Sequence, residues 1–310
     1  MSFDLIKEGL NKIYDITSWS AFLISYNHKS HPNEYVCYNM NFATDELLKS
    51  TISSMSVSYL KIVESYDKKV LDYTGTNPKN TVDKLSVDNP LIKNCWQFIL
   101  EHINNSDDTT KLEDIKAKAY IFVGTYTDND QSHNIYLLTR RNPIINYKKR
   151  RLFTSKNNTI AKSKDPLIQF NKSFDALIYN NIIYMINSNC ESIFNMEYSH
   201  KIICEKCLSE LEISNLINDI ENYKKYALHG QTPKKFITYN PDIIKKLKLT
   251  EYREQLSKKL KIPLNPETKQ FDLNDETHAK HFTLAICGKT KFNMFDKNIC
   301  EVPSFTPLHL

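Results

Sequence analysis

The chain has 310 residues and a formal net charge of +5, with 41% hydrophobic and 25% charged residues. These values are typical of a globular protein with a sizeable buried core, in one large domain or two smaller ones. The most hydrophobic window, 176–186, contains Asn180 and Asn181 and is far shorter than the ~20 residues of a membrane helix, so a membrane-spanning helix is excluded there. The net charge is too small to indicate a nucleic-acid partner by itself.

The first residues and the cysteines indicate a reduced, cytosolic compartment. Asp4 and Glu8 lie where a secretory signal peptide carries basic and then apolar residues. The seven cysteines are an odd number and lack the spacing of a disulfide framework. We therefore expect a cytoplasmic protein.

Residues 1–110 are predicted to form an N-terminal α/β region. Apolar residues at helical spacing predict helices, and runs of β-branched and aromatic residues between turn residues predict strands. Thr44 has the side chain of an N-cap and is followed by acidic residues in a predicted first turn. The expected elements are a helix at 3–16, strands at 19–26 and 34–41, a helix from Thr44, a strand near 68–74 and a helix at 89–103.

The sequence becomes richer in β-forming residues after the polar run 104–110, which marks the predicted domain boundary. Segments rich in β-formers predict an antiparallel β-meander over 116–190, with a helical part over 191–310, so 111–310 is the second predicted domain. The fold class is therefore α+β. The expected strands are 119–127, 134–139, 167–179 and 182–187, and the expected helices are two within 191–228 and one each at 241–249 and 251–261.

One segment concentrates positive charge, because residues 140–164 hold nine basic residues and no acidic one. Four of the chain's five arginines lie there as two adjacent pairs, and the planar fork of Arg suits bidentate phosphate contacts. The aromatic rings of Tyr147 and Phe153 are interleaved where a base could stack. The alternation of residues predicts a twisted β-ribbon within the meander. The predicted nucleic-acid-binding residues are Arg140, Arg141, Tyr147, Lys148, Lys149, Arg150, Arg151 and Lys156.

Two alternatives stay open for this basic segment: a solvated loop, or a surface for acidic lipid or protein. Charge runs usually form solvated surface, whereas the selective use of Arg and the absence of acidic residues favour a polyanion. Charge alone does not distinguish DNA from a membrane partner.

Other motifs that could hold a ligand are weaker. The five glycines are all isolated, which excludes a P-loop and a dinucleotide fingerprint. Cys204-x-x-Cys207 with His200, and His278-x-x-His281, have spacings that a metal could use. Both lie in helical patterns without a second ligand pair, so semi-buried thiols and polar surface are the simpler interpretations. No cofactor or metal is predicted.

A metal-dependent nuclease is the alternative enzyme class for a protein that grips a polyanion. Many nucleases use an Asp/Glu-x-Lys triplet with another acidic residue to hold a hydrated metal. Such triplets occur at Asp67–Lys69, Asp114–Lys116 and Glu267–Lys269, no more often than the composition gives by chance. The sequence also contains no GxSxG and no recognisable Cys/His motif. We therefore expect a protein without catalytic residues.

The run 167–194 resembles the core signature of the KwaB family, the soluble component of the bacterial Kiwa anti-phage system. The shared pattern is a strand ending in Phe174-Asp175, a short turn, an apolar strand at 182–186 and a Glu191-x-Ile-Phe step into a helix. The segments AYIFVGTY and IYLLTRR stand where the family has two preceding strands. Cys190 departs from the family, which often has Phe there. The likeness covers residues 116–305 well and the first 110 loosely.

This resemblance implies a cytosolic antiviral effector that binds DNA and interferes with phage DNA replication or expression. Its implied partner is the multi-span membrane protein KwaA, which would act as the sensor and could recruit it to the inner face of the membrane. We expect a homodimer or higher homo-oligomer that is not an enzyme. The resemblance supplies no functional residue, so the predicted site rests on charge and on the chemistry of Arg.

Overall fold

The computed structural model describes residues 2–16, 18–28, 31–67, 69–106, 110–111, 114–128, 130–145, 153–156, 159–162, 167–292 and 299–301. The chain forms two compact units. The first, called the sheet unit, comprises Met1–Asp72 and Asn80–Met196, and the second, called the helical unit, comprises Tyr73–Lys79 and Glu197–Leu310. This division differs from the predicted domains 1–110 and 111–310. Both units together give the predicted α+β class.

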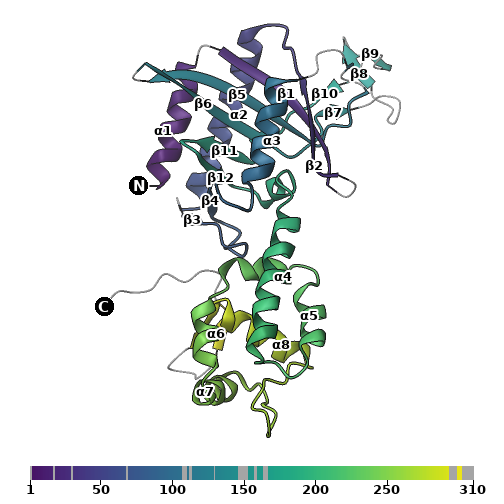
Figure 1. Cartoon of the computed structure of the whole chain (residues 1–310). Coiled ribbons are helices and arrows are strands. Elements are labelled where there is room, and N and C mark those ends of the chain that lie inside the picture. Colours follow the sequence, from purple (N-terminus) through teal and green to yellow (C-terminus); the bar gives the residue numbers. More distant parts are fainter. Residues whose placement is uncertain are drawn as a thin grey trace. The chain divides into compact units, whose positions relative to one another are not determined.

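The sheet unit is built on one eight-stranded sheet in the order β2-β1-β5-β6-β11-β12-β4-β3 (Figure 1). Neighbouring strands are antiparallel except β3 and β4, which are parallel. The strands are β1 (Ser18–Asn27), β2 (His31–Asn39), β3 (Val70–Asp72), β4 (Val82–Ser86), β5 (Ala119–Asp128), β6 (Gln131–Thr139), β11 (Ala176–Tyr179) and β12 (Ile182–Met185).

The predicted meander is confirmed as the consecutive neighbours β5, β6, β11 and β12. Asn180 and Asn181 form its last turn with φ of 50° and 58°, in the left-handed region that Asn tolerates and that a tight two-residue hairpin requires. The expected strand 167–179 is interrupted, because only 167–168 and 176–179 are strand. The strand β4 was not predicted from the sequence.

Strands from the two sides of the predicted boundary share this sheet. β1 pairs with β5, with Leu23 opposite Tyr120 and Trp19 opposite Gly124. The polar run 104–110 therefore lies on a connection within one unit, between α3 (Lys93–Asn104) and β5.

Helices cover both faces of the sheet. On one face, α1 (Ser2–Asp15) and α2 (Asp45–Ser65) bury Ile6, Leu10 and Tyr59 against strand side chains. The side chain of Thr44 caps α2 by accepting from Leu47 N at 3.2 Å, as predicted. On the other face, α3 (Figure 1) packs on β2 and β6, where the rings of Trp96 and Tyr136 meet edge-on at 4.9 Å. Because both faces of the sheet are covered, the four consecutive residues 21–24 of β1 are all buried.

The helical unit has a separate core of buried side chains from its helices, including Cys204, Tyr223, Phe236, Phe271 and Phe282. Figure 1 shows these helices in green and yellow. They are α4 (Met196–Ser214), α5 (Ile220–Ala227), the 3₁₀ helix η3 (Thr232–Thr238), α6 (Pro241–Leu247), α7 (Thr250–Leu260) and α8 (Glu276–Ile286). The chain also forms the 3₁₀ helix η2 (Ser188–Ser192) in the sheet unit and the antiparallel pair β13 (Thr290–Phe292) and β14 (Ile299–Glu301).

The short segment Tyr73–Lys79 is fixed within the helical unit by a buried histidine. His200, on α4, is 4% exposed and its ring stacks on Tyr73, whose hydroxyl lies 3.4 Å from His200 Nε2. Gly75 has φ +78°, and a Cβ there would lie 2.8 Å from the carbonyl oxygen of Lys234, so the segment accepts no larger residue at this point. Burial, with a contribution from Lys234, lowers the pKa of His200 to about 4.

The helical unit is expected to lose stability as the pH falls from the usual histidine pKa of 6.5 toward about 4. In that window the unfolded chain binds a proton at His200 that the folded chain does not, so stability is complete above the unfolded pKa and is lost on acidification. His200→Gln should remove this component, whereas His229→Gln, at an exposed position, should keep it. Urea unfolding followed by far-ultraviolet circular dichroism across this pH range measures the difference. Equal acid sensitivity of wild type and His200→Gln would contradict the assignment.

Candidate nucleic-acid interface

The connection between the neighbouring strands β6 and β11 is called here the basic hairpin, residues 140–175. It contains two antiparallel pairs, one nested inside the other: β7 (Ile144–Ile145) with β10 (Leu167–Ile168), and β8 (Phe153–Lys156) with β9 (Thr159–Lys162). Both pairs are labelled at the upper right of Figure 1. The chain leaves the sheet at the end of β6 and returns at the start of β11, and the two pairs are separate two-stranded sheets. The predicted ribbon covers residues 139–153, of which 146–152 lie outside the described residues, so it stays a prediction.

The root of the basic hairpin is fixed by Asp175, which is 7% exposed. Its carboxylate accepts from Arg140 N at 2.8 Å, its backbone N donates to Leu138 O at 2.9 Å, and its carbonyl accepts from Ile186 N at 2.9 Å. One residue therefore joins the ends of β6, β11 and β12. The direction of the chain at Arg140 is set by these bonds rather than by the charged segment itself.

Aromatic packing fixes the returning side of the hairpin. The ring of Phe170 stacks on Phe42 at 5.8 Å and lies 5.2 Å from Tyr120 and 5.8 Å from Phe122. Beside it, the hydroxyl of Tyr120 accepts from Asn171 N at 3.0 Å. The segment that Arg141 contacts through Asn171 is therefore held in place, so less conformational entropy opposes binding at the root.

The two arginines at the root are both exposed but are held differently. The guanidinium of Arg141 donates to Asn171 Oδ1 at 2.7 Å and to Gln169 Oε1 at 3.4 Å. Both acceptors are neutral amide oxygens, so the positive charge of Arg141 is not cancelled by them. Arg140 is held at its backbone, whose N–H donates to the Asp175 carboxylate, and the residue is exposed. The pair therefore offers two cations just after the end of β6.

The structure places only part of the predicted site. Arg140 and Arg141 lie together at the root, and Lys156 ends β8. Tyr147, Lys148, Lys149, Arg150 and Arg151 lie outside the described residues. Sequence reasoning did not include Asp175, Asn171, Gln169 or Tyr120 as supporting residues. Only the Phe174-Asp175 pair had a sequence signal, since it belongs to the quoted family pattern.

Burial raises the pKa of the Asp175 carboxyl above its usual value, and the hydrogen bond from Arg140 N opposes this effect. A group whose pKa is raised in the folded state stabilises the fold most at low pH, and that contribution is lost as the pH rises through the folded pKa. Burial of the Asp175 carboxylate therefore lowers the stability of the fold at neutral pH, although the same carboxylate accepts the hydrogen bond from Arg140 N.

Asp175→Asn is expected to keep the acceptor without the buried charge. The sheet unit should then be at least as stable as wild type at neutral pH, without the loss of stability on raising the pH. Asp175→Ala leaves the Arg140 N–H without this acceptor and should cost about 1–3 kcal/mol. Urea unfolding followed by the fluorescence of Trp19 and Trp96, both in the sheet unit, measures this. If Asp175→Asn is as destabilising as Asp175→Ala, the negative charge itself is required.

The two other motifs that were considered as ligand sites lie on helices, the cysteines on α4 and the histidines on α8. Burial raises the pKa of the Cys204 and Cys207 thiols, the latter to about 12, and Cys204 Sγ lies 3.5 Å from Ala227 O. His278 and His281 lie on α8, which Asp275 caps through Thr277 N and His278 N. Within the described ranges, no three His, Cys, Asp or Glu side chains gather closely enough to hold a metal ion.

The Asp/Glu-x-Lys triplets also lie apart from the basic hairpin in sequence. Lys69 pairs with Asp67 itself at 3.5 Å, and Lys269 pairs with Glu254 at 3.5 Å. Both pairs are exposed ion pairs, which contribute little to stability.

Comparison with known families decides the affiliation of the chain. The model of one family, described as Kiwa protein KwaB-like, matches residues 116–282. The chain belongs to the KwaB-like family. It is therefore a component of the Kiwa defence system. No curated protein and no solved structure matches it.

The family match begins just before β5 and ends within α8, so it includes the meander, the basic hairpin and most of the helical unit. The strands and helices of residues 1–115 lie outside it. A search of the described helices finds none with the length and apolar character to cross a membrane.

Proposed function

We propose that this chain is a DNA-binding effector of the Kiwa system and that the basic hairpin is its DNA contact. The observation that carries the proposal is the charge of residues 140–164, with nine basic residues and no acidic one, next to a root that hydrogen bonds join to the strands. Phosphate contacts from such a segment supply affinity without reading sequence. Binding of phage DNA would interfere with its replication or expression.

The proposed partners follow from the family. The Kiwa system supplies a membrane protein, KwaA, as the sensor, and the chain would work beside it on the inner face of the cell membrane as a homodimer or higher homo-oligomer. The effector would act by occupying DNA rather than by transforming it.

The test uses the full chain with fluorescently labelled duplex DNA, single-stranded DNA and RNA of equal length. Saturable binding of intact duplex is expected, with or without Mg²⁺ or Mn²⁺. Absence of duplex binding at low salt would overturn the proposal. Loss of intact DNA on adding either metal would replace it with a metal-dependent nuclease.

A further experiment distinguishes DNA from a membrane surface as the ligand of the basic hairpin. Vesicles of anionic lipid and of neutral lipid are incubated with the chain and floated. Co-flotation with anionic vesicles, combined with no binding of duplex, would favour an adaptor whose basic face meets the membrane or its partner protein. Duplex binding that exceeds vesicle binding supports the proposal.

A further inference from the structure

The start of α7, labelled in Figure 1, carries two exposed apolar side chains. Leu249, which directly precedes the helix, is 56% exposed, and Tyr252, in its first turn, is 38% exposed. Side chains three residues apart on a helix are neighbours, so these two lie next to each other. Leu256 follows one turn after Tyr252 and packs against the core. The apolar strip therefore runs from the core of the helical unit to its surface.

Leu249 is an unfavourable residue for its position, which is the N-cap of α7. The helices α5, α6 and α8 begin at Asp219, Asn240 and Asp275, whose side chains accept from backbone N–H groups of the first turn. The side chain of Leu249 makes no such bond. Leucine is among the poorest N-cap residues for this reason. An exposed leucine that does not stabilise its own helix indicates a surface that contacts a partner.

Lysines surround the two apolar side chains. Lys248 directly precedes Leu249, and Leu249 N donates to Lys246 O at 3.0 Å, so both lysines lie within one turn of this leucine. Lys259 follows Tyr252 by about two turns and lies on the same face of α7. All three lysines are exposed.

The charge of this part of the chain is strongly positive. Residues 245–261 hold seven basic and two acidic residues and therefore carry a net charge of +5. Of the two acids, Glu254 pairs with Lys269 outside this run at 3.5 Å, and Glu251 is rotated about 100° around the helix from its neighbour in the apolar pair. Arg253 is half-buried and donates to the Lys269 carbonyl at 2.9 Å. The exposed cations are thus lysines, which act as point charges rather than as forks for one phosphate.

We propose that this lysine surface, defined as Lys246, Lys248, Leu249, Tyr252 and Lys259, docks on an anionic lipid bilayer. Leu249 enters the boundary between headgroups and acyl chains, Tyr252 lies at the level of the headgroups, and the lysines contact lipid phosphates. An exposed leucine adds affinity for a bilayer but adds none for the phosphates of a nucleic acid, so the apolar pair favours lipid. The surface belongs to a different unit from the basic hairpin, so the inference does not rest on DNA binding.

Flotation of the full chain with vesicles tests the proposal. Binding is expected with vesicles of phosphatidylglycerol and phosphatidylcholine, and not with phosphatidylcholine alone, and it should weaken as salt is added. The triple variant Lys246→Ala, Lys248→Ala, Lys259→Ala should bind about a hundredfold more weakly, because each lysine near an anionic surface contributes about fivefold. Absence of wild-type binding to the anionic vesicles at low salt would overturn the proposal, as would equal binding by the triple variant.

Leu249→Ser separates docking from folding. Serine is a favourable N-cap, so urea unfolding followed by far-ultraviolet circular dichroism should show at least wild-type stability. Affinity for the anionic vesicles should nevertheless fall about fivefold or more, because the apolar side chain is lost. Ile213→Ser, at a position on α4 that is 86% exposed, is the matched control and should bind as wild type. Equal vesicle binding by Leu249→Ser and wild type would contradict insertion of this side chain and overturn the proposal.

Two further variants make the result specific to the lysine surface. Replacing Lys206, Lys225 and Lys280 with alanine removes the same charge from exposed positions on α4, α5 and α8 and should leave vesicle binding close to wild type. Arg140→Ala with Arg141→Ala in the basic hairpin should also keep vesicle binding, so failure here is distinguishable from failure of DNA binding. Loss of duplex DNA binding in the lysine-surface variant, with vesicle binding retained, would make nucleic acid the ligand and overturn the proposal.

Discussion

Replacing Phe174 with alanine is expected to destabilise the sheet unit by about 3–5 kcal/mol. Phe174 is 1% exposed and its ring stacks on Tyr59 at 4.3 Å with an interplanar angle of 21°. Tyr59 is itself fully buried and donates from its hydroxyl to Tyr184 O at 2.8 Å, so it cannot easily move to fill the cavity. Removal of the ring loses transfer free energy, an aromatic pair and packing around a fixed neighbour.

This loss would be a large fraction of the ~5–15 kcal/mol that holds a typical domain together. Urea unfolding followed by tryptophan fluorescence reports the sheet unit, because both tryptophans lie within it. Phe174→Leu should cost much less, and Tyr198→Ala, at a position 51% exposed, should leave this transition unchanged. A loss below about 1 kcal/mol for Phe174→Ala would contradict the packing described here.

Phe174 also connects the fold to the proposed function, because it stands next to Asp175 at the root of the basic hairpin. Asp175 fixes Arg140 N, and Phe174 fixes Asp175 by packing into the core. The charged segment is therefore presented by residues that carry no positive charge. Binding and stability are expected to be coupled at this root and independent elsewhere in the hairpin.

Local patterns predicted most elements of the fold. Helical spacing of apolar residues such as Ile6 and Leu10 predicted α1, and the N-cap residue Thr44 predicted the start of α2. Each of these signals acts over a few residues. Local patterns of this kind depend on backbone geometry within a few residues, so the rest of the fold does not change what they predict.

Pairing between distant segments could not be predicted in this way. β1 pairs with β5, which lies about a hundred residues later, and the sequence of neither strand indicates which strand it pairs with. The polar run between them resembled a domain boundary because a surface connection and a linker have the same composition. β4 was missed because VDKLS is short and polar, and its pairing with β12 supplies what its own sequence lacks.

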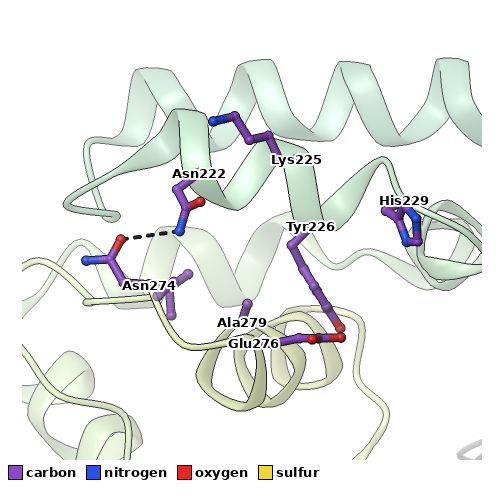
Figure 2. A pocket seen from close by; sticks show the side chains of 8 residues that line it. Asn222, Lys225, Tyr226, His229, Asn274, Glu276 and Ala279 are labelled. Atoms are coloured by element: carbon purple, nitrogen blue, oxygen red, sulfur yellow. Dashed lines mark hydrogen bonds between the residues drawn. The ribbon is translucent and has the colours of Figure 1, made fainter.

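The same distinction between local patterns and distant contacts applies to the candidate site. The concentration of Arg was visible in the sequence, since charge is a property of composition. The partners of Arg141, which are Asn171 and Gln169, lie about thirty residues further along the chain and are brought near only when β7 and β10 pair. The helical unit also has a pocket between α5 and the start of α8 (Figure 2), which had no sequence signal because its lining joins α5 to residues some fifty positions later.

The quadruple variant Arg140→Ala, Arg141→Ala, Arg150→Ala, Arg151→Ala is expected to bind duplex DNA more weakly and with less dependence on salt. Each phosphate contact adds about 0.9 to the slope of log affinity against log salt concentration, through release of counterions. If each arginine holds one phosphate, the slope should fall by about 3–4. The matched control replaces four exposed lysines of the helical unit, Lys245, Lys246, Lys258 and Lys259, and so removes the same charge.

The most direct test of the central claim is this slope, measured by fluorescence anisotropy with one labelled duplex over a series of salt concentrations. The account predicts a shallower slope for the arginine variant, and slopes close to each other for wild type and the lysine control. Equal slopes for wild type and the arginine variant would contradict the claim that the basic hairpin holds DNA.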